Sequence, residues 1–156
     1  MYEKLLSEAE KEQLEIIFHP LHENIKGLYC DGIIAINNNV STTSEKTCVL
    51  AEELGHYYTS TGDILDQSIT KNRKQERQAR AWAYMKLVPL VKLIAASKAG
   101  ISNYPELAEY LNVTERFLTE ALNYYKEKYG MCCRIGDHWI CFDPLSIIED
   151  EERKRA

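Results

Sequence analysis

The sequence predicts an α+β fold: one mostly helical domain that carries small β-hairpins. The chain has 156 residues, of which 45% are hydrophobic and 28% charged, so it has the size and composition of a globular domain. Apolar residues recur at helical spacing along several stretches. Two other stretches are apolar on both sides of an Asp-Gly or Gly-Asp turn, which is typical of hairpins.

The N-terminal third is expected to contain one helix and one hairpin. Residues 5–18 place apolar side chains among charges at roughly helical spacing, which predicts a helix. Pro20 should end this helix, because proline cannot continue it. Residues 27–36 are apolar on both sides of Asp31-Gly32, and this pattern predicts a hairpin.

Two long helices are expected in the centre of the chain. Thr42 and Glu45 have the spacing of a capping box, which predicts a helix at about residues 44–58. A second helix is expected at about residues 70–95, and Pro89 should kink or divide it.

The C-terminal third is expected to contain a helix pair and a second hairpin. Residues 105–112 and 115–129 resemble a helix-turn-helix. Residues 131–135 and 138–142 have the alternating side-chain pattern of strands and flank the turn Gly136-Asp137. We also expect a turn-rich stretch at residues 59–66 and a frayed charged tail at residues 149–156.

Charge and hydropathy argue against several classes of protein. The 24 acidic and 19 basic residues give a net charge of −5, which argues against a protein that coats nucleic acid. The N-terminus is polar, unlike a signal peptide, and no apolar run approaches 18 residues, so we expect no membrane span. The five cysteines have no regular spacing and no C-x-x-C pair, so we expect free thiols in a reducing cytoplasm.

Glu52, Glu53 and His56 form the most informative local pattern. Residues four apart lie on one face of a helix, about 6 Å apart along its axis, so Glu52 and His56 can reach one metal ion together. Glu53 is rotated by about 100° from Glu52 and can face the same cavity as a general base. Gly55 removes a side chain beside His56, which suggests a close neighbour or room for substrate.

Spacing alone leaves other interpretations of this segment open. Two carboxylates and an imidazole on a helix are also typical of a solvated face. Cys48 lies one helical turn before Glu52 on the same helix face, and it is either a soft metal ligand or a buried structural thiol.

The surrounding sequence resembles the ImmA/IrrE family of metallo-endopeptidases. Residues 48–58, Cys-Val-Leu-Ala-Glu-Glu-Leu-Gly-His-Tyr-Tyr, are similar to the active helix of that family, which carries A-H-E-L-G-H. Residues 76–83, Glu-Arg-Gln-Ala-Arg-Ala-Trp-Ala, are similar to the family pattern E-x-x-A-N-x-F-A, and residues 87–89 are similar to the L-x-P that follows. The similarity covers roughly residues 20–130.

The resemblance implies a zincin-like domain and assigns roles to four residues. Glu53 matches the catalytic base, His56 the second metal ligand and Glu76 the third, whereas Glu52 stands where the family has its first histidine. Since carboxylates bind zinc, Glu52, His56 and Glu76 would hold Zn²⁺.

The chain departs from the family pattern at three positions. Besides Glu52, Arg80 replaces an asparagine and Trp82 replaces a phenylalanine. The carboxylate at position 52 makes the ligand set richer in oxygen, which also suits Mn²⁺ or another divalent ion.

By the same resemblance, the chain would be a metallo-endopeptidase of the bacterial host cytoplasm that cleaves a helix-turn-helix repressor of a phage or mobile element. The alternative is a non-catalytic anti-repressor that binds this partner without cutting it. For the residue that stabilises the oxyanion, Tyr57, Tyr58, Tyr84 and His138 are all open candidates.

Two charged segments allow further interpretations. Residues 103–130 resemble a DNA-reading helix-turn-helix, but five acidic and three basic residues give them a net charge of −2, which a phosphate backbone repels. We therefore expect a helix pair packed on the catalytic part. Residues 71–80 contain five basic residues and one acidic residue, which is typical of a solvated helix face or of a surface that attracts an acidic partner.

We expect three parts within one compact domain. Residues 1–103 form the metallopeptidase-like core with the active helix and the third-ligand helix, and residues 104–130 form the helix pair. Residues 131–156 form the C-terminal hairpin and the charged tail.

Overall fold

The computed structural model describes residues 1–60 and 69–151, with the side chains of the second range from residue 72 onward. Most of the turn-rich stretch expected at residues 59–66, and the end of the charged tail from residue 152, lie outside the described residues. The predicted α+β class, mostly helical with small sheets, is confirmed. None of the described helices is long and apolar enough to cross a membrane.

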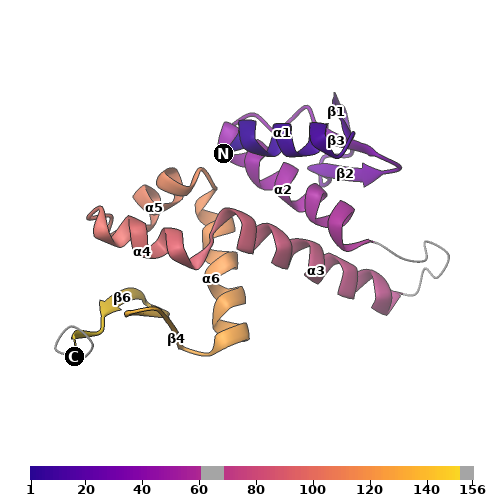
Figure 1. The fold of residues 1–156 in the computed structure, drawn as a ribbon. Helices are drawn as coiled ribbons and strands as arrows, with labels where there is room; N and C mark the ends of the chain where they lie inside the picture. Colours follow the sequence, from indigo (N-terminus) through magenta and orange to yellow (C-terminus); the bar gives the residue numbers. More distant parts are fainter. Residues whose placement is uncertain (61–68, 152–156) are drawn as a thin grey trace.

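Within the described residues, the first helix is followed by a three-stranded sheet, then by a run of helices, and finally by a second three-stranded sheet (Figure 1). The helices are α1 (Tyr2–Lys11), α2 (Thr43–Thr59), α3 (Ile69–Leu87), α4 (Leu90–Lys98), α5 (Tyr104–Leu111) and α6 (Glu115–Tyr129). The strands are β1 (Glu15–His19), β2 (Gly27–Cys30), β3 (Ile33–Asn37), β4 (Cys132–Ile135), β5 (His138–Phe142) and β6 (Leu145–Glu149).

The helix predicted at residues 5–18 is wrong in its second half, which forms β1. Gln13 adopts a positive φ of 58°, which ends helical geometry, and the Leu14 amide donates to the Ala9 carbonyl at 2.9 Å. The next residues are β-branched or aromatic and pair in parallel with β3. Helical spacing in the sequence was therefore overridden by strand pairing with a distant segment.

The N-terminal sheet has the strand order β1-β3-β2, so β3 is central and β2 is an edge strand. The predicted hairpin at Asp31-Gly32 is confirmed, with positive φ angles of 44° and 81° at the two turn residues. Ile34 and Ile36 of β3 are fully buried in the core that this sheet shares with α1 and α2.

Helix α2 begins at the predicted capping box. The Thr42 hydroxyl accepts a hydrogen bond from the Glu45 amide at 3.1 Å, which satisfies one of the free N–H groups at the helix start. Leu50, Ala51 and Leu54 are fully buried, so the helix lies in the centre of the core.

Pro89 divides the long helix predicted at residues 70–95 into α3 and α4, as expected. Leu87 and Val88 are fully buried at the break, and the Tyr125 hydroxyl donates to the Val88 carbonyl at 2.9 Å. Helix α6 therefore fixes the corner at which α3 turns into α4.

The helix pair and second hairpin predicted in the C-terminal third are confirmed as α5, α6, β4 and β5. Strand β6 was not predicted; it adds to β5 and makes an antiparallel sheet beside α4 and α6. The prediction that all five cysteines are free thiols is wrong. Cys132 and Cys141 stand directly opposite each other on β4 and β5 and form a disulfide. Cys30, Cys48 and Cys133 are free.

Candidate active site

Close packing of α2 on α3 positions the candidate residues. A Cβ added at Gly55 would collide with the backbone carbonyl of Ala79 on α3, so only glycine allows this approach. Ala79 is itself fully buried in the contact. The close neighbour expected at Gly55 is therefore a helix, and the contact places Glu76, three residues before Ala79, beside His56.

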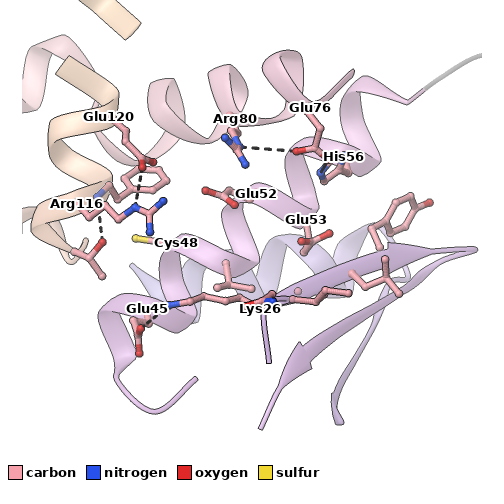
Figure 2. A pocket seen from close by; sticks show the side chains of 18 of the residues that line it. Lys26, Glu45, Cys48, Glu52, Glu53, His56, Glu76, Arg80, Arg116 and Glu120 are labelled. Atoms are coloured by element: carbon pink, nitrogen blue, oxygen red, sulfur yellow. Dashed lines mark hydrogen bonds and ion pairs between the residues drawn. The ribbon is translucent and has the colours of Figure 1, made fainter. Parts of the chain in front are cut away.

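His56 and Glu76, two of the three predicted metal ligands, meet across the two helices (Figure 2). Their Nε2 and Oε1 atoms are 3.3 Å apart. The His56 side chain is 24% exposed and that of Glu76 is 52% exposed, so the pair is open to solvent from the side of α3. An imidazole and a carboxylate at this separation present two donor atoms to the same space.

Glu53, the predicted general base, is buried beside this pair. Its exposed fraction is 8%, and strand β2 covers it because Gly27 has no side chain: a Cβ there would lie 2.7 Å from Glu53 Oε1. Burial raises the pKa of Glu53 to about 8, and the negative charges of Glu52 and Glu76 act in the same direction. A hydrogen bond from the Tyr29 backbone partly opposes the shift.

Glu52, the third predicted ligand, lines the same cleft but faces Arg80 (Figure 2). Burial raises its pKa, the charge of Arg80 opposes this, and the negative charges of Glu120 and Glu76 add to the rise. Within residues 1–60 and 69–151, no three His, Cys, Asp or Glu side chains lie close enough together to hold one ion. The structure thus joins His56 to Glu76 and leaves Glu52 apart from them.

The donor chemistry of this site fits a divalent cation. Glu52, Glu53 and Glu76 all line this part of the cleft, and the negative charges of Glu52 and Glu76 add to the burial that raises the pKa of Glu53. Carboxylate oxygens and an imidazole nitrogen are ligands that zinc and manganese accept. His56 and Glu76, which already meet, would hold such an ion, and Glu52 would join them only by turning from Arg80 toward the pair.

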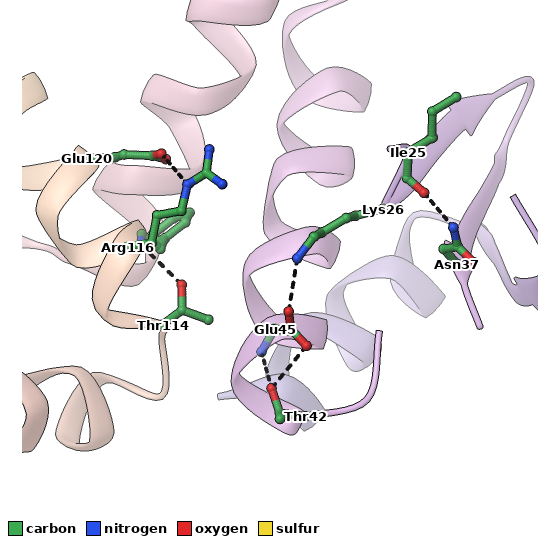
Figure 3. Close-up of polar contacts among 9 residues, drawn as sticks. Ile25, Lys26, Asn37, Thr42, Glu45, Thr114, Arg116 and Glu120 are labelled. Atoms are coloured by element: carbon green, nitrogen blue, oxygen red, sulfur yellow. Dashed lines mark hydrogen bonds and ion pairs between the residues drawn. The ribbon is translucent and has the colours of Figure 1, made fainter. Parts of the chain in front are cut away.

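The candidate residues line a cleft of about 630 Å³ between α2, α3, β2 and the start of α6. Opposite walls carry one ion pair each, Lys26 with Glu45 and Arg116 with Glu120, both at 2.9 Å (Figure 3). Apolar side chains, among them Leu28, Val49 and Phe117, share the lining with the charged ones. A charged and open cleft of this kind suits a polar polymer, such as a peptide, better than a small apolar ligand.

A single buried amide shapes the rim of the cleft before β2. Asn37 Nδ2 donates to the backbone carbonyls of Leu21, His22 and Ile25 at 3.2, 3.1 and 2.8 Å (Figure 3 shows the last). Its Oδ1 lies 3.4 Å from the amide nitrogen of Leu21. The rim from Asn24 to Lys26 is therefore held in place by a residue of the central strand β3.

The four oxyanion candidates do not gather at the cleft. The hydroxyls of Tyr57 and Tyr58 donate to Glu12 and Glu8, which places both rings against α1. His138 lies on β5 of the second sheet, outside the cleft lining. Tyr84 is buried and its hydroxyl donates to Glu120 at 3.3 Å, so it reaches the cleft only through that carboxylate.

Sequence reasoning missed the charged residues that complete the cleft. The sequence places Arg80 on a basic helix face, either solvated or open to an acidic partner, yet it lines the cleft, whereas Arg77, on the same helix, pairs with Glu127 outside it. The spacing of Arg116 and Glu120, four apart on a helix, was the available signal for their pairing.

The start of α6 borders the cleft, which bears on the resemblance of the helix pair to a DNA reader. Thr114, Arg116, Phe117 and Glu120 all line the cleft. In a DNA-binding helix-turn-helix, the first turns of the second helix enter the major groove. Here the same turns face α2 and α3.

Three comparisons with known proteins bear on this fold. The model of the peptidase family described as the IrrE N-terminal-like domain matches residues 9–123. Among solved structures, a Mycobacterium tuberculosis transcriptional regulator is similar, with a TM-score of 0.57 and 13% identity over 78% of this chain. The similarity covers 40% of that longer chain, and at this identity it shows a shared fold. A comparison with curated proteins finds no significant match.

Proposed function

Because the chain belongs to the peptidase family described as the IrrE N-terminal-like domain, we propose that it is a metal-dependent endopeptidase that cleaves a helix-turn-helix repressor of a phage or mobile element in the bacterial cytoplasm. The observation that carries the proposal is the approach of His56 Nε2 to Glu76 Oε1 at 3.3 Å, with Glu53 buried beside them. Membership of a metallopeptidase family and a charged cleft between two helices support the same proposal.

The side chains suit hydrolysis of a peptide bond. When bound, Zn²⁺ or Mn²⁺ at Glu52, His56 and Glu76 would supply Lewis acidity to the scissile carbonyl and to the attacking water. Glu53 would accept a proton from that water as its oxygen attacks the carbonyl carbon, and would pass the proton to the leaving amine nitrogen. Burial under β2 keeps the Glu53 carboxylate away from bulk water during both transfers.

The test is cleavage of the cognate repressor by purified protein loaded with Zn²⁺ or Mn²⁺, followed by gel electrophoresis and mass spectrometry of the fragments. Glu53→Gln should abolish cleavage, because the amide cannot accept the proton. Glu109→Gln, at an exposed position on α5 outside the cleft, is the matched control and should cleave like the wild type. Equal fragment yields from wild type and Glu53→Gln under every metal would overturn the proposal.

A second candidate function is a non-catalytic anti-repressor, and one observation favours it. Among the described residues, Glu52 is not grouped with His56 and Glu76, and Arg80 already brings a positive charge to Glu76 at 3.8 Å. This candidate predicts a stable complex with the intact repressor that wild type and Glu53→Gln form equally well.

A further inference from the structure

Arg80 lies inside the candidate metal site. Its Nε is 3.8 Å from Glu76 Oε2, while the other oxygen of the same carboxylate, Oε1, is 3.3 Å from His56 Nε2. Figure 2 shows the Arg80 side chain directed into the cleft above Glu52. One guanidinium therefore faces two of the three carboxylates of this wall.

The charge of Arg80 is the opposite charge that Glu52 feels most strongly, ahead of the charge of Arg116. The Arg80 side chain is about half exposed, so its ion pair with Glu76 adds little stability by itself. The positive charge of Arg80 would still repel any cation that binds in the cleft, because like charges repel across solvent as well. Glu52 and Arg80 are also two of the positions at which the chain departs from the family pattern, and both line this cleft.

We infer that Arg80 is a built-in counter-cation that competes with the divalent ion for the Glu52 and Glu76 carboxylates and so sets the metal affinity of the cleft. This inference rests on the proposed metal dependence. A bound ion would share the Glu76 carboxylate with Arg80, and the guanidinium would repel that ion. A unit positive charge about 6 Å from a dication weakens its binding about tenfold even at the dielectric constant of water.

The experiment compares three variants with the wild type by calorimetric titration of Zn²⁺ and Mn²⁺ into chelator-treated protein at low ionic strength. Arg80→Gln removes the charge and should bind either ion about tenfold more tightly. Arg80→Lys keeps the charge and should bind like the wild type. Arg77→Gln removes an equal charge from the same helix at a residue paired with Glu127 outside the cleft, and should also bind like the wild type.

Two further measurements assign the effect to the cleft and to charge. In a His56→Ala background, adding Arg80→Gln should leave metal affinity unchanged, because the site is already broken. Raising the salt concentration should shrink the difference between wild type and Arg80→Gln, because salt screens exposed charges.

Equal affinity of Arg80→Gln and Arg77→Gln would overturn the inference, as would weaker binding by Arg80→Gln or no binding by any variant. Binding by Arg80→Gln when the wild type shows none would support it. The proposed function fails separately, when metal-loaded wild type leaves the repressor intact, so the two failures are distinguishable.

Discussion

The two three-stranded sheets differ in construction and in their relation to the cleft. The N-terminal sheet mixes a parallel and an antiparallel pair, and its edge strand β2 lies over α2 with Gly27 against Glu53. The C-terminal sheet is an antiparallel meander joined by the Cys132–Cys141 disulfide. It packs on α4 and α6 and contributes no residue to the lining of the cleft.

This difference separates the residues of the proposed chemistry from residues that serve stability. A change at a residue of β2, α2 or α3 that lines the cleft, or that sets the contact between α2 and α3, should alter metal binding and cleavage. A change in the C-terminal sheet should alter the free energy of unfolding and leave the cleft intact. Four predictions sharpen or break this division, and the first three run from the largest expected effect to the smallest.

The largest effect is expected from Glu76→Gln, which keeps the size of the side chain and removes the anionic donor beside His56. Loss of a residue that merely orients a ligand costs about 10–100-fold in affinity or activity, so loss of a proposed ligand should cost about 100-fold or more. Cleavage rate and metal affinity are both measured. Glu127→Gln on α6 is the control, and similar losses in both variants would remove Glu76 from the site.

Ile140→Ala should strongly destabilise the protein without changing the chemistry. Ile140 lies on β5 and is fully buried, so its truncation leaves a cavity that costs about 2–5 kcal/mol in the free energy of unfolding. Urea denaturation measures this loss. At temperatures where the variant stays folded, its cleavage rate should equal that of the wild type; a slower rate would show that the C-terminal sheet contributes to the cleft.

Gly55→Ala should destabilise the protein and impair metal binding together. The added Cβ meets the backbone carbonyl of Ala79, which cannot rotate away, so we expect a loss of about 1–3 kcal/mol and a separation of His56 from Glu76. Gly136→Ala, in the turn between β4 and β5, is the control. The φ of 59° at this position is unfavourable for alanine and should lower the free energy of unfolding by about 1–2 kcal/mol, while metal binding should be unchanged. Unchanged metal affinity in Gly55→Ala would disprove this account of α2 and α3.

The last prediction is a pH dependence of the metal-free protein, which concerns stability alone. The folded pKa of Glu53, about 8, lies above its ordinary value of 4.5, so the folded state holds this proton more tightly than the unfolded state does. The corresponding stability is present below pH 4.5 and is lost as the pH rises toward 8. Urea denaturation with chelator at pH 5 and pH 8 should show a larger decline for wild type than for Glu53→Gln; equal declines would contradict the burial of this carboxylate.

Local patterns predicted most of the fold because they depend on local physics. The Thr42 cap, the Asp31-Gly32 turn and the break at Pro89 each act within a few residues, and all three lie where the sequence placed them. Strand β1 was predicted as helix because its pairing partner, β3, is distant in sequence. Strand β6 was missed for a similar reason, since its partner β5 decides its conformation.

The candidate site was only partly predictable for the same reason. The four-residue spacing placed Glu52 and His56 on one helix face, but it could not reveal that Glu52 faces Arg80 while His56 meets Glu76. That outcome depends on how α3 crosses α2 at Gly55. A contact between two helices is a tertiary property that neither segment carries alone.

Asn37 has a consequence for how recognition by this protein can change. Its amide group binds the main-chain carbonyls of the segment that leads into the rim of the cleft, and these carbonyls are present whatever side chains the segment carries. The rim can therefore acquire new side chains, and so select different partners, while its backbone path is preserved. Under the proposed function, selectivity and shape would be encoded at separate positions, which would let related proteins follow a changing target without rebuilding their scaffold.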